Sequence, residues 1–394
     1  MNKYPALLGS FLLTLGCFYL SYSTRDLSNS STPIVNNQYV SVQDDHFELQ
    51  GKPFYVAGTN NYYLNYRYNY AIKDVLQQAK ALGLNVVRMW GFLDGANQGI
   101  TVIQPTLGVF QSAGYVKMDY ALALAKSYGI KIILTLVNNW DQFGGMDQYV
   151  HWILGSNGQH DEFYTNPQII KAYENAVAHL IDHRNSITGV LYRNDPTIFS
   201  WELANEPEDA SDPTGKTITA WAAKISSFIH RLDPHHMIDL GDEGWFSASD
   251  PQKSANPGTW GQQKGVDWDA ILRLPYISFG TYHLYPDQWK ATNAWGNLWI
   301  AAHIKAARAA GKPALLEEFG IRNQKEQPSV YRQWIHTVYQ NHGAGEMFWM
   351  LSGDLQPKQP YPNYDGYGVY YPSPTATVLS EGAALIRSLE QPHA

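Results

Sequence analysis

The sequence predicts an α/β protein, a single-domain (β/α)8 TIM barrel, on three observations. From residue 54 onward, short runs of apolar and β-branched residues alternate with longer amphipathic stretches, the pattern of parallel strands joined by helices. Eight such units fit into 394 residues, a length that one elaborated barrel reaches as a single domain. Polar or aromatic residues follow nearly every strand, where the loops of a barrel carry its functional groups. A content of 44% apolar and 16% charged residues agrees with one large core.

The predicted elements follow one another without a second periodic region that would indicate another domain. The predicted strands are Phe54–Gly58, Val86–Trp90, Ile132–Val137, Ile198–Leu203, Met237–Leu240, Tyr276–Thr281, Ala314–Glu318 and Glu346–Met350. The predicted helices are Ile72–Leu82, Val116–Tyr128, Gln168–His183, Thr217–Leu232, Ala291–Ala310 and Ser329–Asn341, with a short fifth connection at Val266–Arg273 and a closing helix at Val378–Leu389.

The N-terminus has the pattern of a targeting segment. An uncharged run from Tyr4 to Tyr22 follows Lys3, so residues 1–22 are predicted to be a signal peptide or a membrane anchor. The run before Cys17 resembles a lipobox, which would end a lipoprotein signal at Cys17; an ordinary signal or anchor with a chance cysteine is equally open. Residues 23–45 are predicted to form a flexible tether and residues 46–394 the catalytic domain. Each version places this domain outside the cytoplasm, secreted or membrane-anchored, and free of disulfides.

Composition narrows the class of ligand. A net charge of −7 and a pI of about 6.0 give no electrostatic reason to expect nucleic acid. The 13 Trp and 27 Tyr are numerous, and several lie in loops beside amide groups, as in Asn60-Asn61-Tyr62-Tyr63. Rings beside amides suit a ligand with apolar faces and many hydroxyls, which describes a sugar. No His or Cys spacing suits a metal, and neither a metal nor a cofactor is expected.

Carboxylates at the strand ends point to glycoside hydrolysis. Retention requires two carboxyl groups about 5–5.5 Å apart. Glu206 directly follows the fourth strand, whereas Glu202 lies four residues deeper and is expected to pair with Arg88 inside the barrel. On the seventh strand, Glu317 and Glu318 are adjacent and are expected to point to opposite sides. Spacing alone does not choose between them.

Motifs along the whole barrel carry a resemblance to a known family. They are Arg88-Met89-Trp90, Leu136-Val137-Asn138-Asn139-Trp140, Phe143-Gly144-Gly145, Asp195-Pro196-Thr197-Ile198, Trp201-Glu202-Leu203-Ala204-Asn205-Glu206-Pro207, Glu243-Gly244, Tyr282-His283-Leu284-Tyr285-Pro286-Asp287, Leu316-Glu317-Glu318-Phe319-Gly320 and Tyr364-Asp365-Gly366-Tyr367. From Phe54 to Tyr371 the chain resembles the endo-β-1,4-mannanases of glycoside hydrolase family 5, especially those of plants and fungi.

The resemblance implies roles for individual residues. It makes Glu206 the general acid/base and Glu318 the nucleophile, so that Glu317 is expected to face outward. Five further positions match the active site of the family: Arg88, Asn205, His283, Tyr285 and Trp349. Three residues are additional candidates for substrate binding, with core packing as the open alternative: Trp90, Asn139 and Trp245. Trp140 is a candidate of the same kind, with the same alternative.

Physical chemistry gives each implied role a reason. Arg88 is expected to keep the nucleophile ionised, and Tyr285 to donate a hydrogen bond to it. Asn205 can donate to the 2-hydroxyl of the sugar being cleaved. His283 is expected to hold the acid/base in position, and Trp349 to form a floor on which the sugar ring stacks.

The expected activity is that of a mannan endo-1,4-β-mannosidase, a retaining glycoside hydrolase that acts as a monomer on mannan, glucomannan or galactomannan. A β-1,4-glucanase, or another β-glycosidase or transglycosylase on the same barrel, is the alternative; a non-catalytic carbohydrate-binding protein or a structural protein is less favoured. The Asn138-Asn139-Trp140 segment favours mannan. One departure is Glu208, where the relatives usually carry arginine on the leaving-group side, so chain-length preference and transglycosylation stay open.

Overall fold

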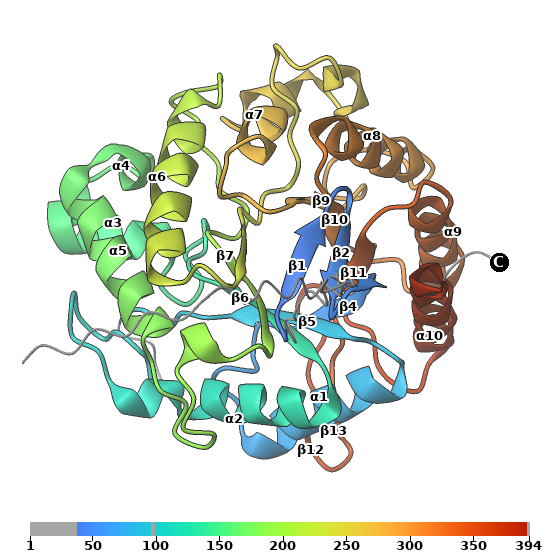
Figure 1. The fold of residues 1–394 in the computed structure, drawn as a ribbon, viewed down its shortest axis with the longest axis horizontal. Coiled ribbons are helices and arrows are strands. Elements are labelled where there is room, and N and C mark those ends of the chain that lie inside the picture. The colour runs from blue at the N-terminus through green and yellow to red at the C-terminus, as the bar shows by residue number, and fades with distance from the viewer. Residues whose placement is uncertain (1–37, 96–98, 392–394) are drawn as a thin grey trace, which may run out of the picture. The chain divides into compact units, whose positions relative to one another are not determined.

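The computed structural model describes residues 38–95 and 99–391. Eight parallel strands lie in the order β8-β7-β6-β5-β4-β11-β10-β9 and curve into a barrel surrounded by helices (Figure 1). The strands are β4 (Val56–Asn60), β5 (Val86–Trp90), β6 (Lys131–Thr135), β7 (Ile198–Glu202), β8 (Met237–Asp239), β9 (Gly280–Leu284), β10 (Ala314–Phe319) and β11 (Gly345–Phe348). The Ser278 N–H, two residues before β9, donates to the carbonyl of Ile238 in β8 at 2.7 Å and thereby links the two ends of the sheet. The predicted TIM barrel is therefore confirmed.

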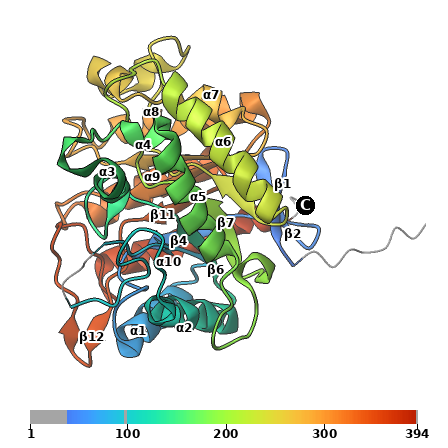
Figure 2. The same cartoon turned by 90° about the vertical axis from the view of Figure 1, so that its left-hand side faces the viewer.

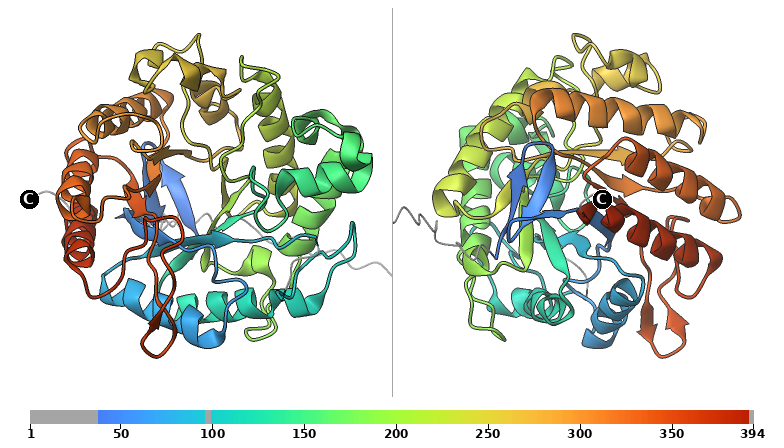
Figure 3. Two further views of the ribbon diagram at one scale, coloured as in Figure 1. Left: turned by 180° about the vertical axis from the view of Figure 1, so that it is seen from behind. Right: turned by 45° about the vertical axis from the view of Figure 1, so that its right-hand side comes forward.

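The helices form a ring outside the strands, as the view from behind also shows (Figure 3). They are α1 (Asn69–Ala81), α2 (Ser112–Tyr128), α3 (Gly145–Leu154), α4 (Glu162–Thr165), α5 (Pro167–Ile181), α6 (Lys216–Leu232), α7 (Trp268–Leu272), α8 (Trp295–Ala310), α9 (Gln327–Gln340) and α10 (Pro374–Arg387). Local chemistry sets some of their starts. The Asn166 side chain accepts hydrogen bonds at the N-terminus of α5, and Ser373 does so at α10, each with proline at the first helical position.

The structure shifts some predicted elements. The sixth strand was predicted at Tyr276–Thr281 but runs from Gly280 to Leu284; Tyr276 is 37% exposed and lies in the loop that leads into the strand. The first predicted strand spans two elements, the end of β3 and the start of β4. Helices α3 and α4 were not predicted, because they are short and lie within the long connection after β6.

A small antiparallel sheet closes the N-terminal end of the barrel. It consists of β1 (Val40–Gln43), β2 (His46–Leu49) and β3 (Lys52–Phe54). Phe47 packs edge to face against Phe199 and Phe279, with ring centroids 5.0 and 5.1 Å apart. The predicted tether of residues 23–45 is thus too long, because residues 40–45 form β1 and the turn after it.

The opposite end of the barrel carries the loops that follow the strands. There the hairpin of β12 (Asp354–Gln356) and β13 (Gln359–Pro360) projects from the body, far from β1 and β2 (Figure 2).

Across residues 38–95 and 99–391, no helix is long and apolar enough to cross a membrane. The predicted signal or anchor, residues 1–22, lies outside the described residues.

One buried carboxyl group makes stability depend on pH. Glu346 of β11 is 1% exposed, its Oε2 atom has no hydrogen-bond partner, and burial raises its pKa to about 8. Because this folded-state pKa exceeds the ordinary 4.5, the folded protein binds the extra proton, and stability falls as pH rises from about 4.5 to about 8.

Glu346→Gln is therefore expected to raise the unfolding free energy at pH 7 by roughly 2 kcal/mol and to change it little at pH 4.5. Urea and thermal unfolding of both proteins at the two pH values would measure this. An equal effect at both pH values would show that the buried charge is not the cause.

Candidate active site

A cavity of about 770 Å³ opens at the C-terminal ends of the barrel strands. Its lining combines carboxyl groups with aromatic rings. Among the lining residues are Glu206, Glu243, Glu318, Tyr62, Trp90, Trp140, Tyr285, Trp349, Tyr361 and Asp365. Apolar rings with a few convergent polar groups form the type of site that binds a sugar.

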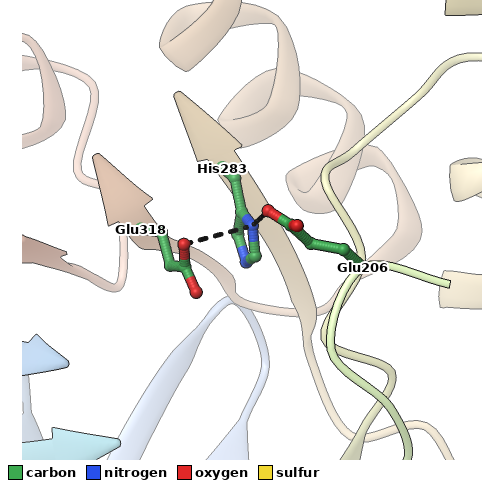
Figure 4. Close-up of side chains that lie close together, drawn as sticks. All are labelled: Glu206, His283 and Glu318. Carbon is green, nitrogen blue, oxygen red and sulfur yellow. Dashed lines mark hydrogen bonds and ion pairs between the residues drawn. The ribbon is translucent and has the colours of Figure 1, made fainter. Parts of the chain in front are cut away.

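Glu206 and Glu318 face each other across this cavity. Glu206 follows β7 in the left-handed backbone region, with φ of +50°, and Glu318 belongs to β10. One oxygen of each lies within 4.8 Å of the other and of a ring nitrogen of His283 (Figure 4). This separation is that of a retaining glycosidase, since inverting enzymes hold their carboxyl groups about 6.5–9.5 Å apart.

Glu318 is held by groups that favour its ionised form. Arg88 pairs with its Oε1 atom, and the Tyr285 hydroxyl donates to its Oε2 atom at 2.6 Å. Burial raises the pKa of Glu318, whereas the charges of His283 and Arg88 oppose that rise. Arg88 itself is fully buried and, as predicted, also pairs with both oxygens of Glu202, at 2.6 and 2.7 Å.

Glu206 has a different set of partners. Trp140 Nε1 donates to its Oε2 atom at 2.7 Å, and His283 Nδ1 lies 2.8 Å from its Oε1 atom. Burial raises the pKa of Glu206, but the hydrogen bonds with His283 and Trp140 outweigh burial and leave the pKa below its usual value. For His283, burial lowers the pKa, but Glu318 and Glu206 raise it well above normal. Both shifts favour the charged forms of the two side chains, a Glu206 carboxylate and a His283 imidazolium joined by the hydrogen bond.

The structure corrects the prediction for Glu317. Strand β10 has a register shift opposite β9: Leu316 pairs with Tyr282 and Glu318 with His283, so Glu317 is an extra residue. A bulge of this kind breaks the alternation of side chains. Glu317 consequently does not face outward but lies inside the barrel, 3.7 Å from Arg88 Nε and 3.5 Å from His283 Nε2.

Two further predicted residues lie in the cavity wall. Asn205 accepts a hydrogen bond from Arg88 at 2.7 Å and donates to Asn138 at 2.9 Å. Trp349 donates from Nε1 to Asp365 at 2.7 Å and stacks on Tyr62 at 5.9 Å between ring centroids. Both arrangements fix the side chain that faces the cavity. Trp90 also lines the cavity, 6.3 Å from the Trp349 ring.

Asn139 and Trp245 are not among the residues that line the cavity. The Asn139 side-chain oxygen accepts from the Glu208 N–H at 3.2 Å and lies 2.9 Å from His160 Nε2. Trp245 is fully buried, and its Nε1 atom donates to Glu243 at 2.8 Å. Asn139 thus holds neighbouring loops together, and Trp245 packs behind the wall.

Three cavity residues have roles in the site that the sequence did not predict. Trp140 contacts the acid/base candidate directly, Asn138 orients Asn205, and Asp365 holds Trp349. Asn138 and Trp140 flank Asn139 in a motif that was recognised, but a motif does not say which of its side chains turn toward the cavity.

The unusual Glu208 is paired with a cation from another loop. Lys264 Nζ lies 2.5 Å from its Oε1 atom and 5.6 Å from the centroid of the Trp260 ring. The charge at this position is thus reversed relative to arginine but compensated locally.

Removing the Trp140 hydrogen bond is expected to raise the pKa of Glu206, since the donor stabilises the carboxylate. Trp140→Phe should shift the basic limb of the pH–activity profile upward by about half a pH unit and lower kcat about fivefold, because one such bond contributes about 1 kcal/mol. Trp260→Phe, which alters another exposed tryptophan, is the matched control. An unchanged basic limb in Trp140→Phe would show that this bond does not tune the acid/base.

Comparisons with known proteins agree with this geometry. Residues 37–370 match the family model described as "GH family 5 beta-mannosidase-like". The chain is a member of glycoside hydrolase family 5.

Relatives of this family cover most of the chain. It is 36% identical to mannan endo-1,4-beta-mannosidase 1 of Solanum lycopersicum over 375 residues, which are 87% of this chain and 91% of the relative. Among solved structures, an endo-1,4-beta-D-mannanase from Thermotoga petrophila is 40% identical with a TM-score of 0.78, covering 84% of this chain and 100% of that chain. An endo-1,4-beta-mannanase from Rhizomucor miehei is 34% identical with a TM-score of 0.80, covering 89% and 99%. The predicted resemblance is therefore confirmed, and the protein is a glycoside hydrolase.

Proposed function

We propose that this protein is a retaining mannan endo-1,4-β-mannosidase that hydrolyses β-1,4-mannosidic bonds by double displacement. The observation that carries the proposal is the pair of carboxyl groups within 4.8 Å, one bound by Arg88 and Tyr285 and the other by His283 and Trp140. The substrate assignment rests on the relatives, whose names specify mannan endo-1,4-β-mannosidase activity.

In the first step, the Glu318 carboxylate attacks the anomeric carbon and forms a glycosyl ester, while the bond to the leaving oxygen breaks. Glu206 gives its proton to that oxygen. Arg88 and Tyr285 orient Glu318 for attack. The proton reaches Glu206 from the shared hydrogen bond with His283, because a bound sugar displaces water from Glu206 and favours the neutral acid.

In the second step, Glu206 accepts a proton from a water molecule, and the resulting oxygen attacks the anomeric carbon. Formation of the ester has removed the negative charge of Glu318, so Glu206 can act as a base. The ester breaks, Glu318 leaves as a carboxylate, and two inversions give net retention. Asn205 lines the cavity, and the second N–H of its side-chain amide donates in this proposal to the 2-hydroxyl, the group whose orientation distinguishes mannose from glucose.

Reducing-sugar release by residues 38–394 from galactomannan, glucomannan, cellulose, xylan and mixed-linkage glucan tests the proposal. Release from the mannans alone is expected. Release from cellulose or mixed-linkage glucan in place of mannan would favour the β-1,4-glucanase alternative on the same barrel. NMR of the first product from an aryl mannoside reports retention directly.

We also propose that the enzyme works as a monomer outside the cytoplasm, secreted or tethered through residues 1–22. The uncharged run before Arg25 supports this localisation. Fractionation of cells that express the full chain, with a Cys17→Ser variant, distinguishes a released, an anchored and a lipidated form. Light scattering of the purified domain measures its oligomeric state.

A further inference from the structure

Glu317 occupies a position that the proposed two-carboxylate mechanism does not use. It is fully buried in the barrel, directly below the ring of His283, and both of its oxygens lack a hydrogen-bond partner in the described part of the chain. The bulge in β10 puts it there, since a regular strand would turn either Glu317 or Glu318 away from the barrel interior. Two consecutive carboxyl groups therefore face the same histidine.

His283 lies between these carboxyl groups. Its Nδ1 atom is 2.8 Å from Glu206 and 3.7 Å from Glu318, whereas Nε2 is 3.5 Å from Glu317. Nε2 is buried and makes no hydrogen bond among the described residues, and the carboxyl group of Glu317 is its ion-pair contact. A carboxylate on this side of the ring favours a proton on Nε2, and Nδ1 is then the ring nitrogen that can exchange a proton with Glu206.

No other charged group among the described residues makes an ion pair with Nε2 of His283. Arg88 lies 3.7 Å from Glu317 but is engaged by Glu202 and Glu318. Asp242, in the loop after β8, is buried and accepts a hydrogen bond from the Gly244 N–H at 2.6 Å, and burial raises its pKa to about 7, so its negative charge is weakened near neutral pH. Asp239 lies within 4.8 Å of Glu317 and of Glu202, deeper in the barrel.

We propose that Glu317 is a positioning residue for catalysis: it fixes the proton on Nε2 of His283, and its charge holds the second proton that His283 shares with the acid/base Glu206. This proposal rests on the proposed function of Glu206 as acid/base. Glu317 does not line the cavity, and it acts on catalysis through the histidine.

The consequence is a pH range of activity that extends further toward alkaline pH. The Glu206–His283 pair must be protonated for the leaving oxygen to receive a proton. A negative charge on the other side of the imidazole ring raises the pKa of the pair, so the pair stays protonated to higher pH. When the charge is removed, the pair loses its proton at lower pH. The basic limb of the pH–activity profile then moves to lower pH.

Glu317→Gln tests this, because glutamine keeps the shape of the side chain but has no charge. We expect the basic limb of kcat/KM on mannan to move down by about one pH unit, with KM at the acidic side of the optimum little changed. Glu317→Asp keeps the charge and should restore most of the wild-type profile. Glu346→Gln, which removes a buried carboxyl group on the neighbouring strand β11, is the matched control and should leave the profile in place.

A second measurement does not depend on activity. In protein labelled with ¹⁵N-histidine, the His283 signals are identified by their loss in a His283→Asn variant, and their pH titration is followed. Glu317→Gln should lower the pKa of His283 by about one pH unit or more. If wild-type protein cleaves no polysaccharide, the proposed function fails, while this titration still decides whether Glu317 stabilises the charged form of His283.

An unshifted His283 titration in a folded Glu317→Gln protein would overturn the proposal. So would a shifted titration with an unchanged basic limb, since Glu317 would then act on the histidine without affecting catalysis. Circular dichroism and thermal unfolding of each variant establish that it is folded before either result is read.

Discussion

Glu318→Ala is expected to lower kcat on mannan by at least about 10³-fold while mannooligosaccharide binding survives. The nucleophile carboxylate is the group that forms the covalent intermediate, so its removal blocks the first step. Arg88 and Tyr285 would lose their shared partner, but both keep contacts with the cavity wall. Initial rates and calorimetric titration with a mannooligosaccharide measure the two effects.

Adding azide to the Glu318→Ala variant tests whether Glu318 is the nucleophile. A small anion can enter the space of the missing carboxylate and attack an activated aryl mannoside from the face that Glu318 occupies. A single displacement then gives the α-mannosyl azide, with inversion. Recovery of the β-azide instead would assign the nucleophile to another residue, and undiminished hydrolysis by Glu318→Ala would refute the mechanism.

Glu206→Ala is expected to have an effect that depends on the leaving group. On mannan, kcat should fall by about 10²–10⁴-fold, because the leaving oxygen needs a proton. With a 2,4-dinitrophenyl mannoside the leaving group needs no protonation, so the first step should stay fast. The second step lacks its base, and a burst of dinitrophenol equal to the enzyme concentration should precede slow turnover.

Azide again separates the roles, since in Glu206→Ala it replaces the activated water and attacks the glycosyl ester. The expected product is the β-mannosyl azide, opposite to that from Glu318→Ala. Equal losses on mannan and on the activated substrate, with no burst, would argue against Glu206 as acid/base. His283→Asn removes the histidine that shares a proton with Glu206, so the rates of this variant on the same two substrates provide a comparison.

Much of this architecture follows from the sequence because it depends on local patterns. Strand β5 was predicted with its observed bounds, since Val86 to Trp90 form an uninterrupted buried run. The pairing of Arg88 with Glu202 also followed, because a buried guanidinium needs a carboxylate and the alternation of strands put both inside. Glu206 and Glu318 came together because barrel strands present their C-terminal ends at one mouth.

Other features depend on geometry that no local pattern encodes. The place of Glu317 required knowledge of a bulge, and a single extra residue in β10 reversed the expected direction of its side chain. Asn139 and Trp245 have the right chemistry for binding sugars, but backbone direction turned one toward Glu208 and the other into the core. Trp140, which follows Asn139 in the sequence, instead donates a hydrogen bond to the acid/base Glu206.

The closing sheet at the base of the barrel bears on how the enzyme can be used. The described chain enters the barrel at Val40, beside strands whose other ends carry the cavity. A polysaccharide can therefore approach the cavity without contacting the segment around Val40. Fusion partners, affinity tags or solid supports joined at the N-terminal side should accordingly leave the working face of the immobilised enzyme open to insoluble mannan.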